Sequence, residues 1–106
     1  TPTARARLGQ AYVELRALQI KVQRSLTDRQ HGKRPGPEGS VDKLLMARAD
    51  QFFGHTMMDL RAGGPLLTEG LEWDIYVWSR AAGIYGGTAQ IQRNIIAQRV
   101  LGLPRA

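Results

Sequence analysis

Apolar residues recur at helical spacing along most of the chain. In residues 3–29 they are separated by three or four positions, which places them on one face of a helix. This stripe consists of Leu8, Tyr12, Leu15, Leu18, Val22 and Leu26. Thr1 is the expected N-cap, with Pro2 at the first helical position. The segment HGKRPGPEG, residues 31–39, is rich in glycine and proline and predicts a loop.

The second stretch, residues 40–62, is apolar over most of the circumference of a helix. Its apolar positions are Val41, Leu44, Leu45, Met46, Ala49, Phe52, Phe53, Met57, Met58 and Leu60. Such a helix is typical of the centre of a bundle, or of contact with partners on more than one face. Ser40 is the expected N-cap, and Asp42 lies in the first turn, where the helix dipole favours negative charge. Gly63-Gly64-Pro65 is expected to end the helix.

Two shorter stretches follow. Residues 71–82 predict a helix rather than a strand, although the middle of the segment has strand propensity. The last helix is expected over residues 88–101, beginning at Thr88 and ending before Gly102. Its inward positions are expected to be Ile91, Ile95, Ile96 and Val100. The predicted fold class is therefore all-α, a helical bundle of three main helices and one short helix.

Composition limits the function classes. The 106 residues make one domain at most, with a core of marginal stability at this size. No run approaches the roughly 18 apolar residues of a membrane span, so no membrane span is expected. The chain has no cysteine, which excludes disulfides and thiolate chemistry and favours a reducing, cytoplasmic location. The net charge of +6 raises the question of an anionic partner: nucleic acid, a membrane surface or a phosphate-bearing cofactor.

The last part of the chain carries a specific resemblance. The segment GGTAQIQRNIIAQRVLGLPR resembles the C-terminal signature of acyl-CoA dehydrogenases, Tyr-(Glu/Gly)-Gly-Thr-x-(Glu/Gln)-Ile-Gln-Arg followed by an aliphatic helix. Three further segments are similar to parts of the same family, in the family's order: AYVELRALQIKVQRSL, GPEGSVDKLL and WSRAAGIYGGT. Family members have an N-terminal helical domain, a middle β-domain and a C-terminal four-helix bundle. The resemblance implies that residues 1–106 are a partial C-terminal helical domain, a fragment or isolated subdomain that lacks the earlier helices.

The resemblance also implies a reaction and a cofactor. Family members use FAD to oxidise an acyl-CoA thioester to the 2,3-enoyl-CoA, and a base removes the α proton while the β-hydride goes to flavin N5. Such chemistry needs a positioned base and hydrogen-bond donors aimed at the thioester oxygen. In many members the base is a glutamate directly after the signature tyrosine, where this chain has Gly86. We therefore expect no catalytic residue in this chain, because in other members the glutamate lies on an earlier helix.

Four residues around the signature are the candidate ligand contacts. By the resemblance, Gly86 and Gly87 bind substrate, because the backbone N–H after the signature tyrosine bonds the thioester carbonyl. Thr88 and Gln90 match positions that contact the flavin. Unpaired N–H groups at a helix start also favour a pyrophosphate. A plain N-cap role for Thr88 competes with flavin contact for the same hydroxyl.

Two other family positions are altered in this chain. Gly63 and Gly64 match a Gln-x-x-Gly-Gly motif that approaches the adenosine part of a neighbouring subunit's flavin, which makes them further candidate FAD contacts. Leu60 replaces the glutamine of that motif, so its polar contact is lost. The neighbouring Arg61 is the candidate substitute for that contact. The alternative role for Gly63 and Gly64 is a simple helix C-cap. Arg80 matches the arginine of a family Arg-Asp pair, but its aspartate is replaced here by alanine.

The implied partners are an acyl-CoA substrate, the missing N-terminal and middle domains, and an electron-transfer flavoprotein as electron acceptor. The oligomer is expected to be a homotetramer or a hetero-oligomer of unlike subunits.

No metal site is expected, because His31 and His55 are not spaced as a metal pair. No nucleic-acid motif is recognisable, so no nucleic-acid partner is expected. Two alternatives stay open: a stand-alone basic helical module that binds an anionic partner, and a catalytically silent structural subunit.

Overall fold

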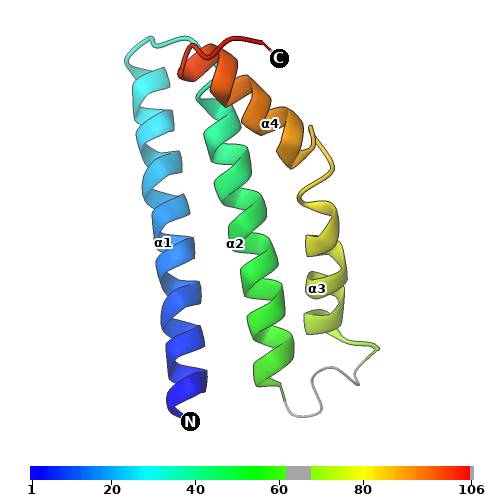
Figure 1. Cartoon of the computed structure of the whole chain (residues 1–106). Helices are drawn as coiled ribbons and strands as arrows, with labels where there is room; N and C mark the ends of the chain where they lie inside the picture. The colour runs from blue at the N-terminus through cyan, green and yellow to red at the C-terminus, as the bar shows by residue number, and fades with distance from the viewer. Residues whose placement is uncertain (62–67, 106) are drawn as a thin grey trace.

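The fold is all α, as the apolar pattern predicts (Figure 1). The computed structural model describes residues 1–61 and 68–105. The helices are α1, Pro2–Gln30; α2, Gly39–Leu60; α3, Leu71–Ala81; and α4, Ala89–Ile95, which continues as a π-helical turn, Ile96–Val100. The first two helices lie side by side in opposite directions, and α3 and α4 follow one another along the other side of α2 (Figure 1).

The two helix starts expected from the sequence differ in outcome. The side chain of Thr1 accepts a hydrogen bond from the N–H of Ala4, 3.1 Å away, which confirms it as an N-cap. The expected cap at Ser40 is wrong, because α2 begins at Gly39, Glu38 takes the N-cap position, and Ser40 is buried within the first turn. The N–H of Ser40 bonds the carbonyl of Pro37, 3.0 Å away. The carbonyls of the preceding loop therefore satisfy the first turn, and no side-chain cap is needed.

The central position predicted for the apolar helix is confirmed, because α2 packs against α1, α3 and α4. The approach of α3 is close at Gly54. A Cβ on Gly54 would lie 2.9 Å from the hydroxyl oxygen of Ser79 and 3.2 Å from the Cα of Tyr76. Glycine is therefore required for this helix contact, since a side chain would push the two backbones apart.

Apart from Leu18, the apolar stripe of α1 does not face α2. Leu8 and Tyr12 are 53% and 65% exposed, while the small Ala11 between them is buried. The less exposed positions of α1 are Ala4, Arg7, Ala11, Glu14, Leu18, Lys21 and Ser25. They repeat every three or four residues like the apolar stripe, but most are small or polar. Periodicity alone does not distinguish the apolar face of α1 from the face of small and polar residues. Ion pairs hold the face of small and polar residues against α2.

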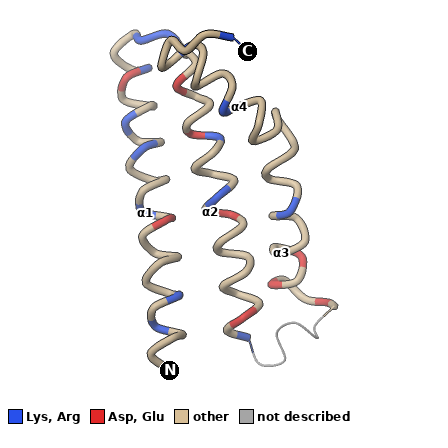
Figure 2. Tube along the Cα trace, in the orientation of Figure 1, with Lys and Arg blue, Asp and Glu red and all other residues tan. Residues whose placement is uncertain are grey.

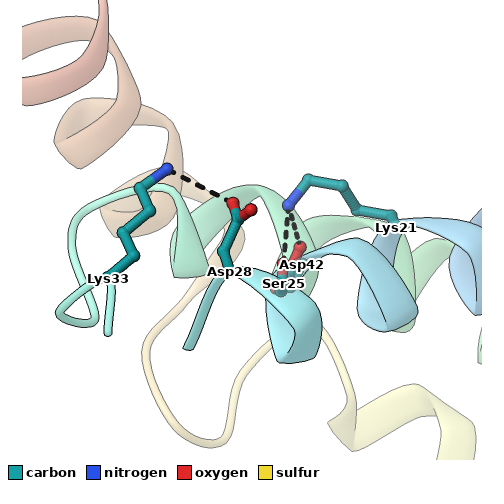
Figure 3. Close-up of polar contacts among 5 residues, drawn as sticks. All are labelled: Lys21, Ser25, Asp28, Lys33 and Asp42. Carbon is teal, nitrogen blue, oxygen red and sulfur yellow. Dashed lines mark hydrogen bonds and ion pairs between the residues drawn. The ribbon is translucent and has the colours of Figure 1, made fainter. Parts of the chain in front are cut away.

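Three ion pairs join α1 to α2 along their length. They are Arg7–Asp59 at 2.6 Å, Glu14–Arg48 at 2.8 Å and Lys21–Asp42 at 2.6 Å. The third pair includes the hydroxyl of Ser25, which donates to Asp42 at 2.9 Å (Figure 3). The α1–α2 interface is therefore polar, which leaves the large apolar side chains of α1 on the outer side.

Little apolar surface is enclosed in the described part of the chain. Four of its five buried apolar residues are alanines, and the fifth is Met58. The radius of gyration is 16.4 Å, whereas a compact domain of about 100 residues has about 13 Å. The helices form a layer with uncovered apolar faces rather than a closed core.

Of the four inward positions expected in the last helix, Ile95 and Ile96 are half-buried, whereas the other two are exposed. Ile91 and Val100 are 52% and 42% exposed, and the buried residue is Gln92. The π-helical turn closes with a bond from the N–H of Leu101 to the carbonyl of Ile96, at 2.9 Å. Its wider winding shifts the residues that follow relative to a regular α-helix. The expected inward stripe therefore does not continue to Val100.

A bilayer-crossing helix requires about 20 consecutive, mostly apolar residues. None of the helices in the described ranges meets that requirement.

Candidate functional site

The two glycines before α4 form a turn that a side chain would strain. Gly86 and Gly87 have φ angles of +65° and +105°, a region that glycine adopts readily and other residues rarely. The carbonyl of Gly86 accepts a hydrogen bond at 3.1 Å from the side-chain amide of Gln92. A Cβ on Gly87 would lie 2.4 Å from the same amide nitrogen. The turn is thus folded tightly around the buried Gln92.

The N–H of Gly86 is available as a donor. Within the described residues it makes no hydrogen bond, and Gly86 itself is exposed. The neighbouring N–H of Ala89 bonds the carbonyl of Gly83 at 3.0 Å, which closes the turn from the other side. The N–H groups of Gly87 and Thr88 are also unbonded among the described residues, so the turn presents three consecutive backbone donors while the carbonyls of Gly83 and Gly86 are held.

Thr88 is the N-cap of α4. Its side-chain oxygen accepts from the N–H of Ile91 at 3.2 Å, so the cap role that competes with ligand contact is present. A hydroxyl that accepts one bond still carries a hydrogen to donate. Gln90 is exposed, and its side chain makes no hydrogen bond to any described residue. Both side chains thus keep polar atoms for a ligand.

A lysine from α2 reaches the same turn. The ammonium of Lys43 donates to the carbonyl of Ala82 at 2.5 Å and lies 4.7 Å from the centroid of the Tyr85 ring. Its Cε lies 3.4 Å from where a Cβ on Gly86 would be. Tyr85 also stacks on Trp78, with ring centroids 6.1 Å apart. Lys43 therefore connects the start of α2 to the residues just before the glycines.

Lys43 and Gln92 were not identified as site residues from the sequence. Each is a polar residue within an apolar helical pattern, which is the local signal that distinguishes them. Their partners lie far away in the chain or on a turn whose shape the pattern does not specify. Only the tertiary contacts assign them to the glycine turn.

Arg80 binds a histidine in place of the aspartate that the family pattern carries. Its guanidinium contacts Nε2 of His55 at 3.0 Å and donates to the carbonyl of Gln51 at 3.3 Å. It also lies 4.9 Å from the centroid of the Tyr76 ring. An open groove of about 400 Å³ runs beside this cluster, with Leu44, Ala47, Phe52 and Arg93 among its lining residues. These contacts are consistent with a structural role for Arg80 at the α2–α3 interface.

The other expected flavin contacts, Gly63 and Gly64, lie outside the described residues. Arg61, the possible substitute for the missing glutamine, is paired with Glu72. Leu60 is 37% exposed at the end of α2. The described part of the site is therefore the turn at Gly86 and Gly87 with the first residues of α4.

Comparison with known proteins places this site in a family. Residues 1–101 match the family described as acyl-CoA dehydrogenase, C-terminal domain. The chain is 40% identical over 108 residues to "Acyl-CoA dehydrogenase IpdE1" of Mycolicibacterium smegmatis, covering 98% of this chain and 26% of that protein. It is 41% identical over 109 residues to "Acyl-CoA dehydrogenase IpdE1" of Mycobacterium tuberculosis, covering 98% of this chain and 28% of that protein.

A third relative matches a shorter part. "Acyl-CoA dehydrogenase FadE34" of Mycobacterium tuberculosis is 38% identical over 74 residues, which are 70% of this chain and 10% of that protein. No solved structure matches the chain. The chain spans about a quarter of the length of the two IpdE1 relatives, 26% and 28%. With nearly all of its length matched, the chain belongs to the acyl-CoA dehydrogenase family, whose C-terminal domain is matched by residues 1–101.

Proposed function

We propose that this chain acts as the C-terminal portion of an FAD-dependent acyl-CoA dehydrogenase that oxidises an acyl-CoA thioester to the 2,3-enoyl-CoA. The observation that carries the proposal is the unbonded N–H of Gly86, among the described residues, on a fixed turn in front of α4. Family membership supplies the reaction class, and the relatives' names give the same class.

In this proposal the Gly86 N–H donates a hydrogen bond to the thioester carbonyl. The bond strengthens as negative charge develops on that oxygen during removal of the α proton. A single donor of this kind contributes about 10²-fold to 10³-fold in rate where it has been removed in other enzymes. Gly87 lets the substrate approach the backbone closely, since neither glycine carries a side chain.

The chain contributes no base to this reaction. Glycine at position 86 has no group to accept a proton, and the nearby Lys43 is an ammonium with donors only. The base therefore belongs to another part of the protein, on a helix that precedes Thr1 in sequence. If no such carboxylate exists there, the protein is a catalytically silent subunit.

The residues at the start of α4 fit a flavin. FAD supplies the hydride acceptor when it is bound. Thr88 keeps a hydroxyl hydrogen after capping the helix, and the exposed Gln90 offers both an amide donor and a carbonyl acceptor. We assign these two residues to flavin contact, with Gly63 and Gly64 as further contacts of a neighbouring subunit's flavin.

The proposed partners follow from the same assignment. They are an acyl-CoA, the N-terminal and middle domains, further subunits of a homotetramer or hetero-oligomer, and an electron-transfer flavoprotein, in a cytoplasmic setting. The uncovered face of α1 supports additional packing, because exposed apolar patches of this kind usually mark interfaces. Leu8, Tyr12 and Leu26 of that face are each more than half exposed.

The alternative of a basic module that binds nucleic acid has only the excess of basic residues on α1 in its favour. Basic residues outnumber acidic ones six to two on α1, but they are spread along the whole helix (Figure 2). Two of them, Arg7 and Lys21, are paired with aspartates of α2. At the α1–α2 junction, Lys21 is paired with Asp42 and Lys33 with Asp28 (Figure 3). Nucleic-acid binding relies on a stripe of basic residues free to meet phosphates.

The test is to express the complete reading frame that contains this sequence and purify the product. We expect FAD absorption bands and acyl-CoA-dependent reduction of an electron-accepting dye, compared across short, branched and polycyclic acyl chains. Bound FAD and acyl-CoA without turnover would identify a silent subunit. A product that binds neither FAD nor acyl-CoA would contradict the proposal.

A further inference from the structure

Lys43 makes two contacts with one short segment of the chain and comes close to a third residue of it. Its ammonium bonds the carbonyl of Ala82 at 2.5 Å, its charge lies 4.7 Å from the Tyr85 ring centroid, and its Cε approaches Gly86. The lysine is half-buried in the first turns of α2, 39 residues away in sequence from Ala82. No other side chain in the described ranges donates to the Ala82 carbonyl.

The carbonyl of Ala82 needs this partner. Ala82 follows the last residue of α3 and is fully buried at 0% exposure. The last carbonyls of a helix have no partner within the helix, and a cation at that end also interacts favourably with the helix dipole. The ammonium thus fixes the point at which the chain leaves α3 toward the glycines.

The charge of Lys43 has no carboxylate partner among the described residues. The ion pairs there involve Arg7, Lys21, Lys33, Arg48 and Arg61 instead. The ammonium lies over the face of Tyr85, where the ring quadrupole attracts a cation. Tyr85 immediately precedes Gly86, so this contact restrains the residue whose carbonyl group is joined to the Gly86 N–H.

We propose that Lys43 is a positioning residue that holds the Ala82–Gly86 segment so that the Gly86 N–H stays oriented toward the acyl thioester carbonyl. This inference rests on the proposed function. Gln92 holds the same turn from the carbonyl side of Gly86, at 3.1 Å. The donor is therefore fixed from both α2 and α4.

The test uses the full-length protein with two substitutions at Lys43 and one control. K43M keeps a long apolar stem and removes the charge and the donors, and K43R keeps both. K33M is the matched control, because Lys33 is a 57% exposed lysine paired only with Asp28. Five quantities are measured: FAD content, amide hydrogen exchange of residues 82–91, kcat, KM, and the carbonyl ¹³C chemical shift of a bound, carbonyl-labelled enoyl-CoA.

For K43M we expect amide exchange in residues 82–91 to rise about tenfold or more and kcat to fall by about tenfold or more, because small misplacements of a positioned group are costly in rate. KM and FAD content should change less than twofold, and the ¹³C signal should move toward its position in free ligand. K43R should recover most of the protection and rate, and K33M should match the unaltered protein.

The inference is overturned if K43M leaves exchange and kcat unchanged, or if K43R behaves as K43M does. If K43M does not fold, K43R is the deciding variant. Slow amide exchange of residues 82–91 in K43R supports the inference, and fast exchange there overturns it. Failure of the proposed function has a different signature, because the unaltered protein would then neither bind FAD nor oxidise an acyl-CoA. The exchange measurement would still report whether Lys43 holds the turn.

Discussion

The side-chain amide of Gln92 donates a hydrogen bond to the carbonyl oxygen of Gly86, 3.1 Å away, while Gln92 itself is 7% exposed. The bond joins the first turn of α4 to the glycine turn that precedes it. It is also the reason for the close contact at Gly87, since the same amide nitrogen lies 2.4 Å from the position of a Cβ there. A buried polar side chain therefore determines the shape of the candidate site.

Replacing Gln92 should destabilise the protein. Gln92→Leu keeps a similar volume but removes the donor, and we expect a loss of about 0.5–1.5 kcal/mol because the hydrogen bond to the Gly86 carbonyl is lost. The free energy of unfolding, measured with urea, checks this. Gln90→Leu on the exposed side of the same helix is the matched control, with an expected change within about 0.5 kcal/mol. Equal effects of the two substitutions would contradict the assigned role of Gln92.

Alanine at the glycines should give an ordered series of stabilities. Gly86→Ala is expected to cost about 1–2 kcal/mol, because φ is +65° and a left-handed backbone strains L residues. Gly87→Ala should cost more, since its Cβ also meets the Gln92 amide. Gly9→Ala is the control: nothing lies within 4 Å of its Cβ position in α1, and a gain of up to about 1 kcal/mol is expected. Thermal unfolding of the three variants is the measurement. The predicted order would be disproved if Gly87→Ala lowered the melting temperature least of the three.

Thr88 has a cap role and a proposed flavin role that substitution can separate. Thr88→Asp keeps an oxygen that caps the helix, so stability should stay within about 0.5 kcal/mol, but it removes the hydroxyl donor and adds a negative charge. We expect weaker FAD retention in the full-length protein, measured by flavin release on dilution. Thr88→Ser should preserve both properties. Unchanged FAD affinity in Thr88→Asp would leave Thr88 as a helix cap only.

The ion pairs at the α1–α2 junction should differ in their contribution. Asp42 is 21% exposed and accepts from both Lys21 and Ser25, whereas Asp28 is 54% exposed and accepts from Lys33 at 3.4 Å (Figure 3). Asp42→Asn should cost about 1–3 kcal/mol, because bonds to a charged, half-buried group are lost. Asp28→Asn should cost less than about 1 kcal/mol, as exposed pairs usually do. Urea unfolding of the two matched variants compares them, and a larger loss for Asp28→Asn would refute this ranking.

Close packing of α2 on α3 gives a further prediction. Gly54→Ala places a Cβ 2.9 Å from the Ser79 hydroxyl oxygen and 3.2 Å from the Tyr76 Cα, which is backbone and cannot rotate away. We expect a loss of about 1–3 kcal/mol from overpacking, even though alanine favours a helix over glycine. The melting temperature is the measurement. Stabilisation instead of loss would mean that α3 can move away from α2.

The sequence by itself determined the local features and the family. Helical spacing gave four helical stretches because hydrogen bonds within a helix depend only on near neighbours in the chain. The cap at Thr1 and the central place of α2 followed from residue type and apolar pattern, and both are confirmed. The signature around Gly86 indicated the family, which the comparisons confirm.

Only the tertiary structure decided which faces meet and what holds the turn. In α1 the apolar positions and the polar ones share the same period, so ion pairs such as Lys21–Asp42 decide which face lies against α2. The loop carbonyls displaced Ser40 as a cap, and the π-helical turn redirected the end of the last helix. Lys43 and Gln92 reach the turn at Gly86 from separate helices. Periodicity is a property of one segment, whereas these contacts depend on the distances between segments, which exist only once the helices have packed.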